Sequence, residues 1–86
     1  MKIDNIDNFL RGWFVGNFEP TLIKTNDVEV AYKSYKTGDK EAAHYHKIAT
    51  EITLVVKGSV KMNNKIFKEN DIIILKPSEV CHFEVL

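Results

Sequence analysis

The sequence predicts an all-β domain, an antiparallel sandwich or barrel, preceded by a short N-terminal helix or arm. Two observations support this prediction, the first for the all-β class and the second for a single domain. From Thr21 onward, short apolar or alternating stretches are separated by turn residues at regular spacing. The chain also has only 86 residues, 44% of them hydrophobic and 28% charged, with no internal repeat and no low-complexity segment. Those values are typical of a single folded domain, here residues 1–86.

The first 20 residues are predicted to form an arm that differs from the β-barrel of residues 21–86. Four apolar residues recur in it at spacings of three and four: Ile3, Ile6, Phe9 and Leu10. This spacing indicates a short amphipathic helix, which Asp4 or Asn5 could cap. The next stretch, Gly12–Pro20, is predicted to be an apolar arm or an irregular strand that packs on another surface.

The strands of the remaining chain follow from alternation and from turn residues. Val28, Val30 and Tyr32 occupy alternate positions, which predicts a strand to about Tyr35, and residues 37–40 form a turn. Further strands are predicted at 42–46, 51–57, 60–62, 66–68, 72–75 and 82–86. Asn63-Asn64 is predicted to be a tight hairpin turn, because Asn tolerates the positive φ that such turns need.

Composition excludes several classes of function and raises a question of stability. Twelve basic and twelve acidic residues leave no net charge, so nothing indicates a nucleic acid or an anionic membrane as a partner. No apolar run approaches a membrane span, and no signal peptide is evident. The single cysteine, Cys81, cannot form an internal disulfide, which favours a cytoplasmic location. A domain this small usually needs a metal or a partner subunit to be stable.

The three histidines and one glutamate form a candidate metal site. His44 and His46 lie two residues apart on a predicted strand, so their side chains share one face. Glu51 begins the next strand, and His82 begins the last one. Imidazole and carboxylate groups together suit a divalent transition metal and can leave coordination positions open, as a catalytic site requires. Alternatively, these side chains could be polar residues on half-exposed strands.

These residues resemble a known family. The pattern Gly38-x5-His44-x-His46-x4-Glu51-x6-Gly58 resembles the first motif of the cupin superfamily. Asn70-Asp71, Pro77 and His82 resemble the second motif, although Asn70 and Glu79 stand where that family prefers Gly. Asn can replace a loop Gly where positive φ is needed.

The resemblance implies a small cupin-type β-barrel, which is a jelly roll or double-stranded β-helix. It also implies that His44, His46, Glu51 and His82 hold one divalent transition metal per chain, which could be Fe, Mn, Ni, Zn, Co or Cu. Family members usually continue with further strands after the second-motif histidine, whereas this chain ends four residues later. We therefore expect a C-terminally minimal barrel, completed either by a partner chain or by the N-terminal arm, or left incomplete.

The patterning around Glu51 indicates a partner subunit. If Glu51 points inward, so do Thr53 and Val55, and an apolar stripe then points outward: Ile52, Leu54 and Val56. Such a stripe is typical of an interface. Residues 72–75 are apolar on both faces, so we expect a homodimer in which the stripe and the Trp13-Phe14-Val15 arm are covered.

Several functions fit this site. The first is a metal-dependent enzyme on a small organic molecule, in which the metal acts as a Lewis acid in isomerase, epimerase or dioxygenase chemistry. No general base is evident beyond the ligands, so a tyrosine or a metal-bound hydroxide would have to serve, and no catalytic residue is assigned. The alternatives are a non-catalytic module that binds a small molecule such as a sugar, or a protein whose metal is purely structural. Cys81 is expected to be a buried apolar residue, and Tyr45 is expected to face outward.

Overall fold

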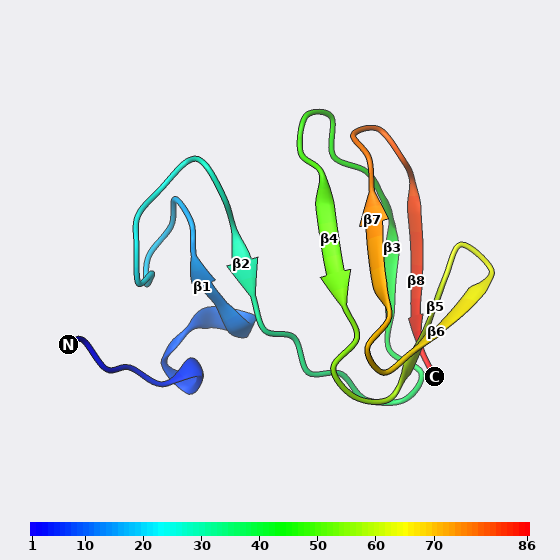
Figure 1. The fold of residues 1–86 in the computed structure, drawn as a ribbon, viewed down its shortest axis with the longest axis horizontal. Helices are drawn as coiled ribbons and strands as arrows, with labels where there is room; N and C mark the ends of the chain where they lie inside the picture. Colours follow the sequence, from blue (N-terminus) through cyan, green and yellow to red (C-terminus); the bar gives the residue numbers. More distant parts are fainter. The chain divides into compact units, whose positions relative to one another are not determined.

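Eight short β-strands and two 3₁₀ turns make up the regular structure of the chain (Figure 1). They are seen in a computed structural model that describes the backbone of residues 1–86 and every side chain except that of His44. The predicted all-β class is confirmed. No helix in this described chain is long and apolar enough to cross a membrane. The chain divides into two units, Met1–Ser34 and Tyr35–Leu86, each described by itself below.

The first unit begins with two 3₁₀ turns, η1 (Ile6–Asn8) and η2 (Leu10–Gly12), where an amphipathic α-helix was predicted. Asn5 caps the first turn as expected, because its side-chain oxygen accepts a hydrogen bond of 2.9 Å from the Asp7 amide. The turns do not merge into a helix, since Phe9 between them has an extended backbone, with φ −109° and ψ 151°. Arg11 and Gly12 in the second turn also have positive φ. Nucleating an α-helix in so short a segment is unfavourable without extensive packing.

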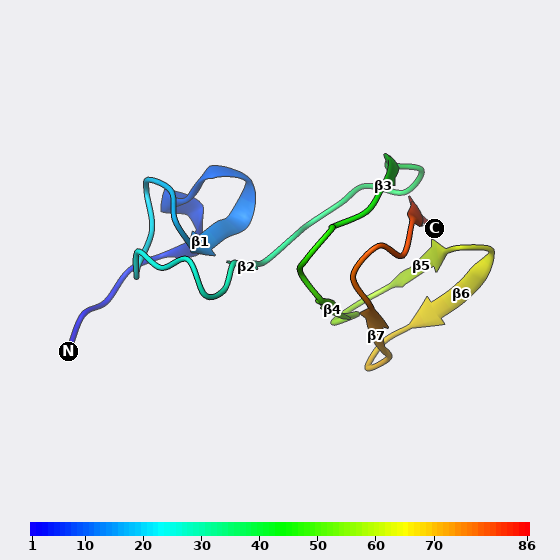
Figure 2. The same ribbon diagram turned by 90° about the horizontal axis from the view of Figure 1, so that it is seen from above.

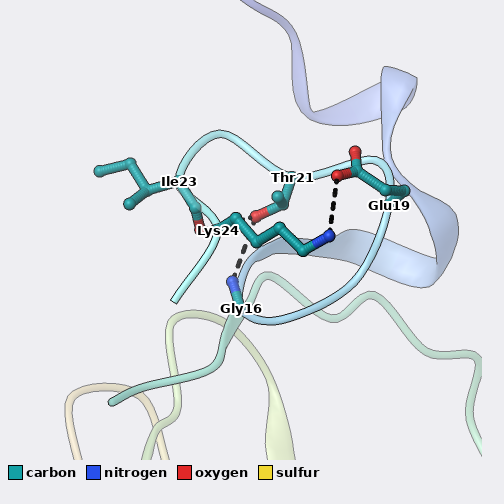
Figure 3. Close-up of polar contacts among 5 residues, drawn as sticks. All are labelled: Gly16, Glu19, Thr21, Ile23 and Lys24. Atoms are coloured by element: carbon teal, nitrogen blue, oxygen red, sulfur yellow. Dashed lines mark hydrogen bonds and ion pairs between the residues drawn. The ribbon is translucent and has the colours of Figure 1, made fainter. Parts of the chain in front are cut away.

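A small antiparallel sheet follows, in which β1 (Trp13–Val15) pairs with β2 (Val30–Ala31). Gly12 lies so close to Tyr32 that an added Cβ would come within 1.8 Å of the Tyr32 carbonyl oxygen, so only glycine fits. Thr21 organises the loop between these strands. Its hydroxyl accepts from the Gly16 amide at 3.1 Å and donates to the Ile23 carbonyl at 3.0 Å (Figure 3).

The second unit contains two antiparallel sheets (Figures 1 and 2). The larger has the order β3-β8-β5-β6, and the smaller pairs β4 with β7. Their bounds are β3 Lys40–His44, β4 Glu51–Leu54, β5 Ser59–Met62, β6 Lys65–Lys68, β7 Ile72–Leu75 and β8 Cys81–Val85. Over the described backbone these strands form separate sheets and do not close into a barrel.

The core of the second unit lies between its two sheets. Buried Leu75 of β7 packs with Met62 of β5 and Cys81 of β8. Four partly buried residues pack against this cluster: Val60, Phe67, Ile73 and Phe83. The sequence-based interpretation of Cys81 as a buried apolar residue is confirmed, since it is 2% exposed.

Three turns of one design connect the strands of the second unit, at residues 36–39, 68–71 and 76–79. In each, a lysine amide donates to the carboxylate three residues later, at 2.8–3.0 Å, and the amide of that acidic residue donates back to the lysine carbonyl. The third residues, Gly38, Asn70 and Ser78, all have positive φ, as a type II turn requires. The expectation that Asn70 supplies positive φ is confirmed. Asn63 and Asn64 also have positive φ, as the predicted hairpin requires.

Ser78 is the unfavourable member of this set, because a serine at φ 72° is strained where glycine is not. Replacing Ser78 by Gly should therefore raise the free energy of unfolding by about 1 kcal/mol, which corresponds to roughly 4–8 °C in Tm for a domain of this size. Thermal and urea unfolding followed by circular dichroism measure this. The matched control is Thr37→Gly, at a turn position without positive φ, where the same change should destabilise by about 0.5–1 kcal/mol. A loss of stability in Ser78→Gly would contradict the strain argument.

Candidate metal centre

Strand β4 positions Glu51 on the core side of the second unit. Burial alternates along the strand, with Glu51 and Thr53 half-buried and Ile52 and Leu54 exposed, and Val55 just beyond it is buried. Side chains two residues apart share a face, so Glu51 points to the side that Val55 occupies. This alternation is the one predicted from the sequence.

Glu51 meets His46 from the connection between β3 and β4. The distance from His46 Nε2 to Glu51 Oε1 is 3.6 Å, with the histidine side chain 52% exposed and the glutamate side chain 31% exposed. The Ser78 amide donates a hydrogen bond of 2.7 Å to the His46 carbonyl oxygen. The turn at residues 76–79 therefore anchors the backbone that carries this imidazole.

The donor atoms of this pair suit one metal ion. Ligand distances of about 2.0–2.2 Å place two neighbouring ligands of a tetrahedral or octahedral ion about 3.0–3.5 Å apart. The separation of 3.6 Å between His46 and Glu51 is close to that range. Partial exposure of both side chains leaves a path by which an ion or a small molecule can reach them.

The other two predicted ligands lie on neighbouring strands of the larger sheet, His44 on β3 and His82 on β8. His44 ends β3, and its backbone pairs with Cys81 of β8. Its side chain lies outside the described part of the structure. His82 is described, and it is exposed on β8 between buried Cys81 and core-packed Phe83.

The structure thus places the two neighbours on β8 the other way round from the ligand arrangement that the resemblance implies. Cys81 points into the core, so His82 points to the opposite face of the strand. Asn63 fixes this register. Its side chain accepts from the His82 amide at 2.8 Å and donates to the Val80 carbonyl at 2.9 Å, and its own amide donates to the His82 carbonyl at 3.1 Å. Among the described side chains no group of three or more His, Cys, Asp or Glu residues is placed to hold a metal.

Tyr35 and Glu41 are neighbours of the site that the sequence did not identify as a pair. The Tyr35 hydroxyl donates a hydrogen bond of 2.7 Å to Glu41 Oε1, and its ring packs on Phe83 with centroids 5.1 Å apart. Burial is the largest cause that raises the pKa of Tyr35, followed by the hydrogen bond and charge of Glu41 and the charge of Glu51. The sequence alone did not point to this contact, because the fold brings Glu41 to Tyr35.

The same two carboxylates act on Cys81. Burial raises the pKa of its thiol, and the negative charges of Glu51 and Glu41 raise it further. The thiol is therefore neutral at physiological pH, which fits a packing role and not that of a nucleophile.

The first unit contains two hollows, of about 180 and 250 Å³. The larger is lined by aromatic and charged side chains that include Trp13, Phe18 and Glu29. Trp13 and Phe18 meet edge to face at 6.4 Å, and the Lys33 ammonium lies 4.8 Å from the Trp13 ring centre. These hollows belong to residues 1–34 and do not include His46 or Glu51.

No family model, curated protein or solved structure matches this chain.

The Tyr35–Glu41 contact predicts a pH-dependent stability. Because the folded chain raises the pKa of Tyr35 above its ordinary value near 10, folding favours the protonated phenol. This stabilisation is complete below about pH 10 and is lost as pH rises above it. Urea unfolding from pH 8 to 11.5 should show the free energy of unfolding falling more steeply in the wild type than in Tyr35→Phe. Glu41→Gln, which removes one of the causes, should lie between them. Identical slopes in all three proteins would contradict this assignment.

Proposed function

We propose that this chain binds a divalent transition metal at the His46–Glu51 pair and presents it to a small organic molecule. The observation that carries the proposal is the 3.6 Å approach of an imidazole nitrogen and a carboxylate oxygen from separate segments. The spacing of these residues supports it, since both belong to the pattern that resembles the first cupin motif.

His44 is the proposed third ligand, because it stands two residues before His46 in that pattern. His82 is the proposed fourth ligand, and it can reach the same side only if β8 shifts by one residue, which exchanges the two faces of a strand. The chain is accordingly proposed to be a small cupin-type protein whose barrel is open in the described structure. Its ligands would have to be neutral imidazoles and an ionised carboxylate, so metal binding weakens at acidic pH.

The bound metal would act as a Lewis acid on an oxygen of the small molecule, in chemistry like that of sugar isomerases and epimerases or of oxygenases. The residues near it supply limited acid–base capacity. Tyr35, held by Glu41 at 2.7 Å, stays protonated at neutral pH and is the described phenol whose pKa responds to the charge of Glu51. A non-catalytic site that holds a sugar or a similar ligand uses the same metal and the same open positions.

A structural metal is the second candidate, and the small core favours it. In the described chain the buried hydrophobic residues are Val55, Met62, Leu75 and Cys81. A core of that size contributes little stability to a domain of this length, and a metal that binds only the folded chain would add to it.

Removal of single ligands tests the metal site. Elemental analysis and calorimetric titration with Mn²⁺, Co²⁺ and Zn²⁺ should show one ion per wild-type chain. His46→Ala and Glu51→Gln should each weaken the binding by ~100-fold or more, because each removes an atom that binds the ion, and losing a residue that only supports a ligand already costs about 10–100-fold. Glu41→Gln is the matched control, since its carboxylate also lies near Tyr35 and Cys81 but is not paired with His46. His82→Ala decides between three and four ligands.

Two results would contradict the proposal. One is a wild-type protein that takes up no stoichiometric metal under any of these conditions. The other is an equal loss of binding in Glu41→Gln and Glu51→Gln, which would show a general electrostatic effect and not coordination.

Cobalt spectroscopy distinguishes an open site from a structural one. In an open site, adding azide to the Co²⁺-loaded protein should change the visible d–d bands, because azide can occupy a free coordination position. In a closed structural site the bands should stay unchanged, and a chelator should lower Tm by many degrees. Unchanged bands would favour a metal with a purely structural role and would overturn the proposal that the metal binds a small molecule.

A further inference from the structure

The outer face of the β4–β7 sheet is apolar at every position. Ile52 pairs with Ile74 and Leu54 pairs with Ile72 across the two strands. All four side chains are more than half exposed, as is Val56, which follows β4. The inner face of the same sheet carries Thr53, Ile73 and Leu75, and the latter two join the core. The expectation that Ile52, Leu54 and Val56 point outward is therefore confirmed.

The size of this face is that of an interaction surface. Five aliphatic side chains at 53–69% exposure present roughly 500 Å² of apolar area, the size of the largest apolar patch on a typical monomer, and such a patch is often functional. Two such faces in contact would bury about 1,000 Å², which reaches the lower limit for a specific interface before any rim is counted.

We infer that this face binds the same face of a second copy, forming a symmetric dimer through β4 and β7. The four paired positions carry no charge and no hydrogen-bonding side chain, so they select no charged or polar partner. These four positions form a rectangle of branched aliphatic side chains. A two-fold rotation that exchanges the antiparallel strands places Ile52 on Ile72 and Leu54 on Ile74, so the face is nearly symmetric and suits a two-fold interface. A second copy of the chain carries the same apolar face, and it is present at the same concentration as the first copy.

Sedimentation equilibrium on the full chain tests the dimer. The wild type should sediment at twice the 9.9 kDa chain mass at micromolar concentration. Ile52→Asp should raise the dimer dissociation constant by ~100-fold or more, because the interface would then bury a carboxylate. Ile66→Asp on β6 is the matched control, since Ile52 and Ile66 are both 69% exposed and only Ile52 belongs to the face. It should leave the dissociation constant unchanged.

A charge-swap experiment excludes simple misfolding of the variants. The double variants Ile52→Lys/Ile74→Lys and Ile52→Asp/Ile74→Asp should each be monomeric, because two like-charged faces repel. Mixed together they should form a heterodimer, which two unfolded chains would not do. Circular dichroism of each variant confirms that the sheet is retained.

Three outcomes would overturn the inference. The first is a wild type that stays monomeric up to about 1 mM, well above the concentrations at which an interface of this size associates. The second is an equal dissociation by Ile66→Asp. The third is a monomer whose β4 amides are protected from hydrogen exchange and lose that protection when residues 1–34 are mutated, which would identify the first unit of the same chain as the occupant.

Discussion

Alternation of side chains between the two faces of a strand is the constraint on which this molecule depends. Strand β4 shows it most directly, because Glu51 points to the core side while Ile52, its neighbour, points outward. Because successive side chains of a strand point to opposite faces, Glu51 cannot change face unless Ile52 changes face as well. The proposed metal ligand and the proposed dimer face therefore lie on opposite faces of the four-residue strand β4. An interaction that orders β4 orders both of them.

The same constraint governs β8, where Cys81 and His82 are neighbours and cannot both face the core. Burial of Cys81 in the core directs His82 outward, and the hydrogen bonds of Asn63 to residues 80 and 82 hold that register. Three such bonds contribute about 0.5–1.5 kcal/mol each. Structural metal sites release about 10–16 kcal/mol in small zinc domains. A metal that needs His82 would have to repay these bonds and also the burial of Cys81 and Phe83, whereas one satisfied by His44, His46 and Glu51 would leave the strand as it is.

The sequence predicted the features that local rules decide. The inward position of Glu51, the outward Ile52 and the positive φ of Asn63 and Asn70 all follow from alternation or turn chemistry, and each is confirmed. Local rules do not decide the remaining features, which depend on the length of a segment or on distant residues. An apolar spacing of three and four suggested a helix that so few residues cannot nucleate. The face on which His82 lies depends on Asn63, 19 residues away, and on which neighbour the core buries.

Sheet β4–β7 carries both the proposed metal ligand Glu51 and the proposed dimer face. It is a two-stranded ribbon, and such ribbons are marginally stable unless a face is packed. Its inner face packs through Ile73 and Leu75, while its outer face, with Ile52 and Leu54, is exposed in the single chain. A dimer that covers the outer face would order β4 and with it Glu51. A ligand ordered in advance costs less entropy to bind, so dimerisation should tighten metal binding, and by thermodynamic linkage the metal should tighten the dimer by the same factor.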